Sequence, residues 1–215
     1  MNRAAKKSRL FDNDADYGAF QHVLIEALSR FDVAFYSYIF MPNHWHFVLS
    51  SRRDSTISRF MHWLETTHAR RWGLAKGVEG QGAVYQGRFK AIPIQTEHRF
   101  LWVCRYVERN ALRAGLVERA EDWRWSSLWQ RHNVAFGPQV SPWLVTEPVD
   151  WIAEVNAPQT QSEIDAFRRA VNLGRPYGDE EWSRTVGHNP LRRRGRPARS
   201  QKLCPLKMTP DPIYR

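Results

Sequence analysis

The chain has 215 residues, 42% of them apolar, which is enough for one sizeable core but not for two independent enzyme domains. Lys and Arg total 32 against 22 Asp and Glu, and the resulting net charge of +10 favours a polyanionic partner, nucleic acid before an anionic membrane. No run of about 18 apolar residues occurs, so we expect no membrane span. The cysteines, Cys104 and Cys204, are too far apart to suggest a disulfide framework, and we expect a cytoplasmic protein.

The first part of the chain predicts a helix followed by a hairpin. Apolar side chains recur with a helical period over Asp14–Phe31. Val33–Phe40 is apolar on both faces, as in a strand that is covered on both sides. The Pro42-Asn43 pair favours a turn, and His44–Ser50 is predicted to be the second strand of the hairpin.

Three further elements are predicted in the middle of the chain. Helical spacing starts at Ile57 and is expected to end near Gly73. A short strand is predicted over Ala83–Ile94 and a long helix over Thr96–Leu112. The order α-β-β-α-β-α predicts an α+β fold with helices packed on one antiparallel sheet.

The C-terminal part is less regular and divides into two regions. A capping box at Thr160 opens a helix that runs towards Leu173, and a short helix is predicted over Asp179–Val186. From His188 onward there are six Arg and two Lys against one Asp, typical of an extended basic arm. We therefore predict a main domain over residues 1–130, a helical extension packed on it over 131–187, and a basic, flexible tail over 188–215.

Two histidines alternate along the second predicted strand. Residues two apart in a strand point to the same face, so His44 and His46 project together while Trp45 turns to the core side. Two imidazoles on one face can share a metal ion. Taken alone, such a motif is more commonly a pair of hydrogen-bonded histidines in an ordinary sheet.

The predicted long helix carries one polar stripe. Tyr106 and Asn110 are one turn apart, and Arg99 and Arg113 lie seven residues to either side of Tyr106. Guanidinium groups suit phosphate, a phenol can act as nucleophile, and an amide oxygen can bind a metal. The alternative is a solvated helix face with a tyrosine half-buried against the sheet.

Other residues suggest DNA contacts. Some of the 10 tryptophans could stack unpaired bases if exposed, although large aromatic side chains usually belong to the core. The tail motif Arg194-Gly-Arg196-Pro is similar to an AT-hook, which lies along a narrow minor groove. A disordered tail that keeps the protein soluble is the alternative.

Several blocks together resemble a known family. Met41-Pro-Asn-His-Trp-His46, Val84-Tyr-Gln-Gly-Arg-Phe-Lys90 and the block from Tyr106 to Val117 closely resemble the REP-associated tyrosine transposases, which belong to the single-tyrosine HUH transposases. The similarity continues through Trp123-Arg-Trp-Ser-Ser127 and Leu173-Gly-Arg-Pro-Tyr-Gly178 and covers nearly the whole chain in order.

The resemblance implies a ferredoxin-like sheet (the HUH nuclease fold) and a role for each matching residue. It makes Tyr106 the nucleophile and His44, His46 and Asn110 the ligands of a divalent metal, Mg²⁺ or Mn²⁺, so these side chains should converge on one site. Relatives have a strand just before the segment that matches Asn2-Arg-Ala4, so we expect the first strand of the sheet to be missing from this sequence. Candidate DNA-binding residues are the basic side chains of the matching blocks and the tail: Arg88, Lys90, Arg99, Arg113, Arg192, Arg193, Arg194 and Arg196.

The resemblance also implies a substrate. Members of the family cut and rejoin single-stranded DNA beside repetitive extragenic palindrome hairpins through a covalent 5′-phosphotyrosine. We therefore expect a nucleoid-associated transposase that is monomeric or homodimeric. The alternatives are a cleavage-deficient protein of the same ancestry that binds DNA hairpins in an architectural or regulatory role, and a general RNA-binding protein, which no recognised RNA module supports.

Overall fold

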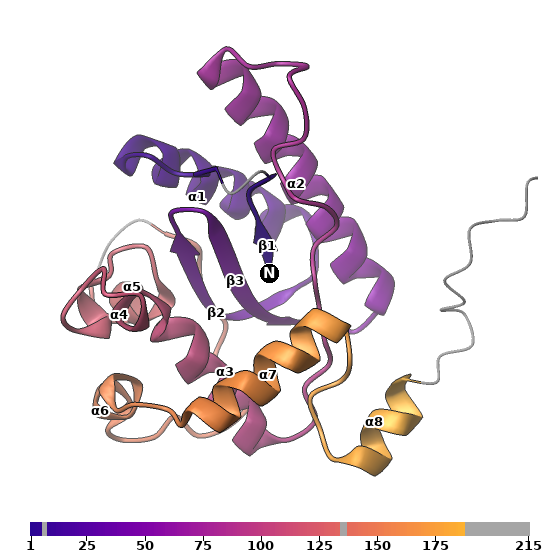
Figure 1. Cartoon of the computed structure of the whole chain (residues 1–215), viewed down its shortest axis with the longest axis vertical. Helices are drawn as coiled ribbons and strands as arrows, with labels where there is room; N and C mark the ends of the chain where they lie inside the picture. Colours follow the sequence, from indigo (N-terminus) through magenta and orange to yellow (C-terminus); the bar gives the residue numbers. More distant parts are fainter. Residues whose placement is uncertain (6–7, 134–136, 188–215) are drawn as a thin grey trace, which may run out of the picture.

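The computed structural model describes residues 1–5, 8–133 and 137–187. At its centre is a three-stranded antiparallel sheet in the order β1-β3-β2 (Figure 1). The strands β2 (Ala34–Met41) and β3 (His44–Ser50) form the predicted hairpin, with Met41 opposite His44. The α+β class with helices packed on an antiparallel sheet is confirmed.

The edge strand β1 consists of Asn2–Arg3. It lies in the Asn2-Arg-Ala4 segment, just before which relatives have a further strand. It pairs antiparallel with β3, with Asn2 opposite Trp45 and Arg3 opposite His44. Paired residues point to the same face of a sheet, so Arg3 shares its face with His44.

The strand predicted over Ala83–Ile94 is wrong. The segment makes only isolated bridges, from Tyr85 to Ala4 and from Ile94 to Tyr177. Pro93 has no N–H to donate to a ladder, and Gly87 interrupts the stretch, so a continuous strand is disfavoured. The amide of Lys90 instead donates to the carbonyl of Met1 at 2.9 Å.

Two helices cover one face of the sheet (Figure 1). They are α1 (Asp14–Arg30), as predicted, and α2 (Asp54–Lys76), which continues past the predicted end at Gly73. A glycine inside a helix costs only about 1 kcal/mol, and Lys76 gains an ion pair with Asp16 at 2.9 Å. The helix ends instead at Gly77, whose φ of 64° suits a residue without a side chain.

The other face of the sheet is covered by α3 (Glu97–Glu108) and by the helices that follow it. The single helix predicted over Thr96–Leu112 is wrong in one respect, because a turn at Arg109 separates α3 from α4. The capping box at Thr160 and the helix behind it are confirmed. The remaining elements are α4 (Asn110–Arg113), η2 (Ala120–Asp122), α5 (Ser127–His132), α6 (Trp151–Asn156), α7 (Gln161–Leu173) and α8 (Glu180–Gly187).

The sequence did not predict the short helices α5 and α6, but they complete this second core. Trp151 and Val155 of α6 and Ile164 and Phe167 of α7 are buried against α3. Among the described helices, none is both long and apolar enough to cross a membrane.

Candidate active site

The strand β3 divides its side chains between the two faces of the sheet. Trp45 is completely buried against α1, and its ring lies 6.1 Å from that of Phe20. His44 and His46 point to the opposite face, with ring centroids 5.1 Å apart. The alternation that the sequence predicts for these three residues is confirmed.

Tyr106 lies on α3, the helix that packs on the histidine face. The centroids of the Tyr106 and His46 rings are 5.9 Å apart and meet edge to face. The structure thus brings Tyr106, His46 and His44 together, from elements about 60 residues apart in the chain.

The short helix α4 carries Asn110 and Arg113, and it brings Arg113 to the ring of Tyr106. Asn110 is buried, and its Nδ2 has no hydrogen-bond partner in the described part of the chain. The guanidinium carbon of Arg113 lies 4.2 Å from the centroid of the Tyr106 ring. Tyr106 and Arg113 of the predicted stripe therefore remain neighbours across the turn at Arg109.

Both histidines are held in the neutral form. Burial lowers the pKa of His44 to about 4, and the nearby charges of Arg3 and Arg113 act in the same direction. Burial also lowers the pKa of His46 well below its usual value, with the neighbouring His44 as the next cause. The neutral imidazole is the form that binds a metal.

A hydrogen bond orients the ring of His44. Its Nδ1 lies 2.6 Å from Oδ1 of Asn43, an acceptor, so Nδ1 carries the proton in the neutral ring. The lone pair of Nε2 is then free for another partner. Such a second hydrogen bond is how proteins fix the tautomer and orientation of a ligating histidine.

Aromatic side chains enclose the ring of Tyr106, which is only 5% exposed. Trp102 stacks on it with ring centroids 5.6 Å apart, and Phe167 of α7 packs at 4.7 Å. Nε of Arg168 donates to the phenol oxygen at 3.5 Å. Sequence reasoning missed Arg168, because the helical period of α7 does not reveal which distant residue it contacts.

A buried carboxylate fixes α3 in place. Glu108 is fully buried and accepts hydrogen bonds from Ser37, Ser127 and the indole of Trp151, at 3.1, 2.6 and 2.8 Å. It also pairs with Arg131 at 2.6 Å. The sequence signal for this network was a charged residue one turn after Cys104, on the apolar side of the helix.

Arg88, Lys90 and Arg99 are the remaining predicted DNA-binding residues in the described part of the chain. Arg88 and Lys90 line a hollow of about 280 Å³ beside β1, which Arg3 also lines. The guanidinium of Arg99 lies 4.9 Å from the ring centroid of Tyr177. The four predicted tail residues lie outside the described residues: Arg192, Arg193, Arg194 and Arg196.

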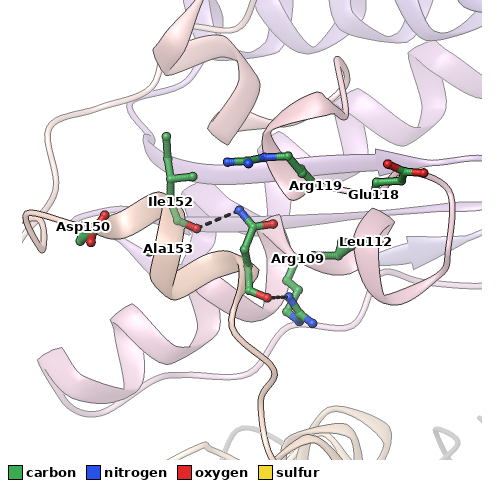
Figure 2. Close-up of a pocket in the computed structure, with 8 residues that line it drawn as sticks. Arg109, Leu112, Glu118, Arg119, Asp150, Ile152 and Ala153 are labelled. Atoms are coloured by element: carbon green, nitrogen blue, oxygen red, sulfur yellow. Dashed lines mark hydrogen bonds between the residues drawn. The ribbon is translucent and has the colours of Figure 1, made fainter.

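A second hollow, of about 570 Å³, lies between α4 and α6 (Figure 2). Arg109 points into this region and donates to the backbone carbonyl of Val155 at 3.0 Å and to that of Asn156. Glu118 and Asp150 also line it. None of the predicted catalytic or metal-binding side chains does, so the size of a hollow does not identify the site here.

Comparisons with known proteins assign the family. No curated protein matches the chain. One solved structure, described as "Structure of the REP associates tyrosine transposase bound to a REP hairpin", is similar over 69% of this chain and 88% of its own, with a TM-score of 0.51 and 16% sequence identity, which is a likeness of fold. The family model described as "Transposase IS200 like" matches residues 1–110, more than half of the chain and the range that holds β3, Tyr106 and Asn110. The chain belongs to the IS200-like transposase family.

Proposed function

We propose that the protein is a metal-dependent endonuclease and strand transferase for single-stranded DNA, with Tyr106 as its nucleophile. The observation that carries the proposal is the 5.9 Å between the rings of Tyr106 and His46, in a strand where His44 shares the same face. A phenol beside two neutral imidazoles combines a nucleophile with metal ligands. Membership of a transposase family supplies the class of substrate.

The proposed reaction exchanges one ester for another. The phenol oxygen of Tyr106 forms a bond to phosphorus, and the bond from phosphorus to the 3′ oxygen breaks. The leaving oxygen keeps the electron pair and takes up a proton, while the phenol loses one to water. The products are a 5′-phosphotyrosine and a free 3′-hydroxyl, and a second 3′-hydroxyl can reverse the step without ATP.

His44, His46 and Asn110 are the residues that would hold Mg²⁺ or Mn²⁺. Their donor set fits, because both imidazoles are neutral and the side chain of Asn110 offers an amide oxygen. When bound, a divalent ion supplies Lewis-acid polarisation of a phosphate oxygen. Asn43 contributes by orienting the ring of His44.

The proposed DNA partner is a palindromic repeat hairpin with a single-stranded flank. The support is the fold shared with a structure described as bound to a REP hairpin. A basic hollow beside β1 is lined by Arg3, Arg88 and Lys90. Because β1 pairs with β3 next to His44, we propose that these basic side chains bind the single-stranded flank. The protein would act on cytoplasmic DNA as a monomer or homodimer.

Covalent capture tests this proposal. Purified protein is incubated with Mn²⁺ and a labelled oligonucleotide that carries a hairpin and both flanks, then resolved on a denaturing gel. We expect a labelled band at the mass of protein plus one DNA fragment, together with release of the other fragment. A Tyr106→Phe variant should give neither, and a wild-type protein that binds the hairpin without any adduct would reject the proposal.

The second candidate is a cleavage-deficient hairpin-binding protein with an architectural or regulatory role. The observation that favours it is the 5% exposure of Tyr106, whose ring Trp102 and Phe167 cover. In that case the hairpin should bind with equal affinity with and without Mn²⁺, and Tyr106→Phe should change nothing that can be measured on DNA.

A further inference from the structure

The guanidinium of Arg113 has no anionic partner among the described residues. Both of its terminal nitrogens are buried and have no hydrogen-bond partner in the described part of the chain, and its guanidinium lies over the Tyr106 ring. In that same part of the chain no Asp or Glu forms an ion pair with it. An unpaired buried charge is costly, so such a site favours an anion from outside the protein.

Arg168 brings a second guanidinium to the same phenol from α7. Its Nε lies 3.5 Å from the oxygen of Tyr106. The preceding residue, Phe167, is buried and packs on the Tyr106 ring at 4.7 Å, which fixes this turn of α7 over the tyrosine. In our proposed division of the chain, Arg168 belongs to the extension over 131–187, outside the 1–110 range that the family model matches.

The two arginines affect one another. Burial lowers the pKa of Arg113, and the positive charge of Arg168 adds to that effect. A bound anion would relieve both the missing partner of Arg113 and the repulsion between the two guanidinium groups. Guanidinium forks match the non-bridging oxygens of a phosphate, and clamps of this kind stabilise the charge that develops during phosphoryl transfer.

We infer that Arg113 and Arg168 form a clamp for the scissile phosphate, which holds it against Tyr106 with one guanidinium over the ring and the other beside the phenol oxygen. The inference rests on the proposed function of Tyr106. Attack requires roughly 3–3.5 Å between the phenol oxygen and phosphorus. A guanidinium already 3.5 Å from that oxygen can therefore reach a non-bridging oxygen of the bound phosphate. The clamp stabilises the transition state, and the remainder of the DNA is bound elsewhere.

The experiment compares Arg168→Gln with Arg169→Gln, the next residue on the same exposed part of α7. Single-turnover cleavage of the hairpin oligonucleotide with Mn²⁺ should slow by about 100-fold in Arg168→Gln, because loss of one such donor costs about 10²–10³ in rate. Arg169→Gln should stay within about twofold, because a surface substitution without a partner has little effect. Hairpin affinity and the unfolding midpoint should match the wild type in both variants.

A neutral substrate separates the clamp from a structural effect. A methylphosphonate at the scissile position replaces one non-bridging oxygen with a methyl group and removes the negative charge. On this substrate, the cleavage rates of Arg113→Gln and Arg168→Gln should fall below the wild-type rate by a much smaller factor than on the normal phosphodiester. An equal loss on both substrates would overturn the clamp, as would a wild-type rate in Arg168→Gln. If the wild-type protein itself forms no adduct, the proposed function fails instead, so the two failures are distinguishable.

Discussion

The two faces of β3 differ in the chemistry that they bury. One face presents Trp45 and Phe47 to α1 and α2, in a core of stacked aromatic rings. The other presents His44 and His46 to α3, where the neighbouring groups are a phenol and a guanidinium that has no anionic partner in the described part of the chain. Both faces belong to the same seven-residue strand.

This difference shows how one strand can serve stability and chemistry at once. Side chains alternate across a strand, so a rigid core on one face fixes the positions of the histidines on the other. Substitutions on the aromatic face should unfold the protein, and those on the histidine face should abolish activity with little loss of stability. The predictions below test that separation.

The largest effect is expected for Tyr106→Phe, which removes one hydroxyl and keeps the ring against Trp102 and Phe167. Strand cleavage and covalent capture should be abolished, because no other nucleophile is proposed. Hairpin affinity, measured by fluorescence anisotropy, should change by less than about twofold, since the lost contact is a single hydrogen bond. Cleavage at the native rate in this variant would place the nucleophile elsewhere.

Trp45→Ala should do the opposite, lowering the stability of the fold while leaving the chemistry of the site intact. Trp45 is 0% exposed, and truncating a buried tryptophan costs about 3–5 kcal/mol of folding free energy. Urea unfolding should show a large drop in midpoint. Metal-dependent cleavage by the fraction that stays folded should persist, because the histidine face is unaltered.

His44→Ala is the matched substitution on the other face. The concentration of Mn²⁺ at half-maximal cleavage should rise at least about 10-fold, as for lost metal contacts. The urea midpoint should fall far less than in Trp45→Ala, since His44 is only half-buried. Equal destabilisation by the two variants would mean that the histidine face is structural too.

A smaller, pH-dependent effect is expected on the aromatic face from His68 of α2. Burial lowers its pKa from 6.5 to about 3, against the opposing charge of Asp16. Below pH 6.5, His68 is therefore protonated in the unfolded chain but stays neutral in the folded chain. The contribution of His68 to the free energy of unfolding is complete above pH 6.5 and falls by about 1.4 kcal/mol per pH unit as the pH drops towards 3. Urea unfolding from pH 7 to 5 should show a shallower pH slope for His68→Gln than for the wild type.

The smallest effect should come from deleting the tail, residues 188–215, which lies outside the described residues. If half of its six positive charges between 192 and 202 neutralise phosphates, the slope of log affinity against log salt should flatten by about 2 units. Base preference near the hairpin should barely change, because phosphate contacts carry no sequence information. Equal slopes with and without the tail would favour a role in solubility alone.

Local periodicity was sufficient to predict the elements of the site. The bounds of β3 and the face of each histidine follow from alternation. Helical spacing set Tyr106 and Asn110 one turn apart, but the resemblance to the transposase family was needed to single out Tyr106 as the nucleophile. The strand predicted over Ala83–Ile94 failed because Gly and Pro leave it only isolated bridges. The sequence could not predict the contact between Arg168 and Tyr106, because the two residues are 62 positions apart and only the packing of α7 brings them together.

The most direct test of the account is to identify the residue that carries the DNA. The covalent adduct formed with Mn²⁺ is digested with a protease and a nuclease, and the modified peptide is identified by mass spectrometry. We predict a nucleotide joined through its 5′-phosphate to the phenol oxygen of Tyr106, in the peptide that follows Arg105. A nucleotide on any other residue, such as Tyr85 or Tyr177, would contradict it.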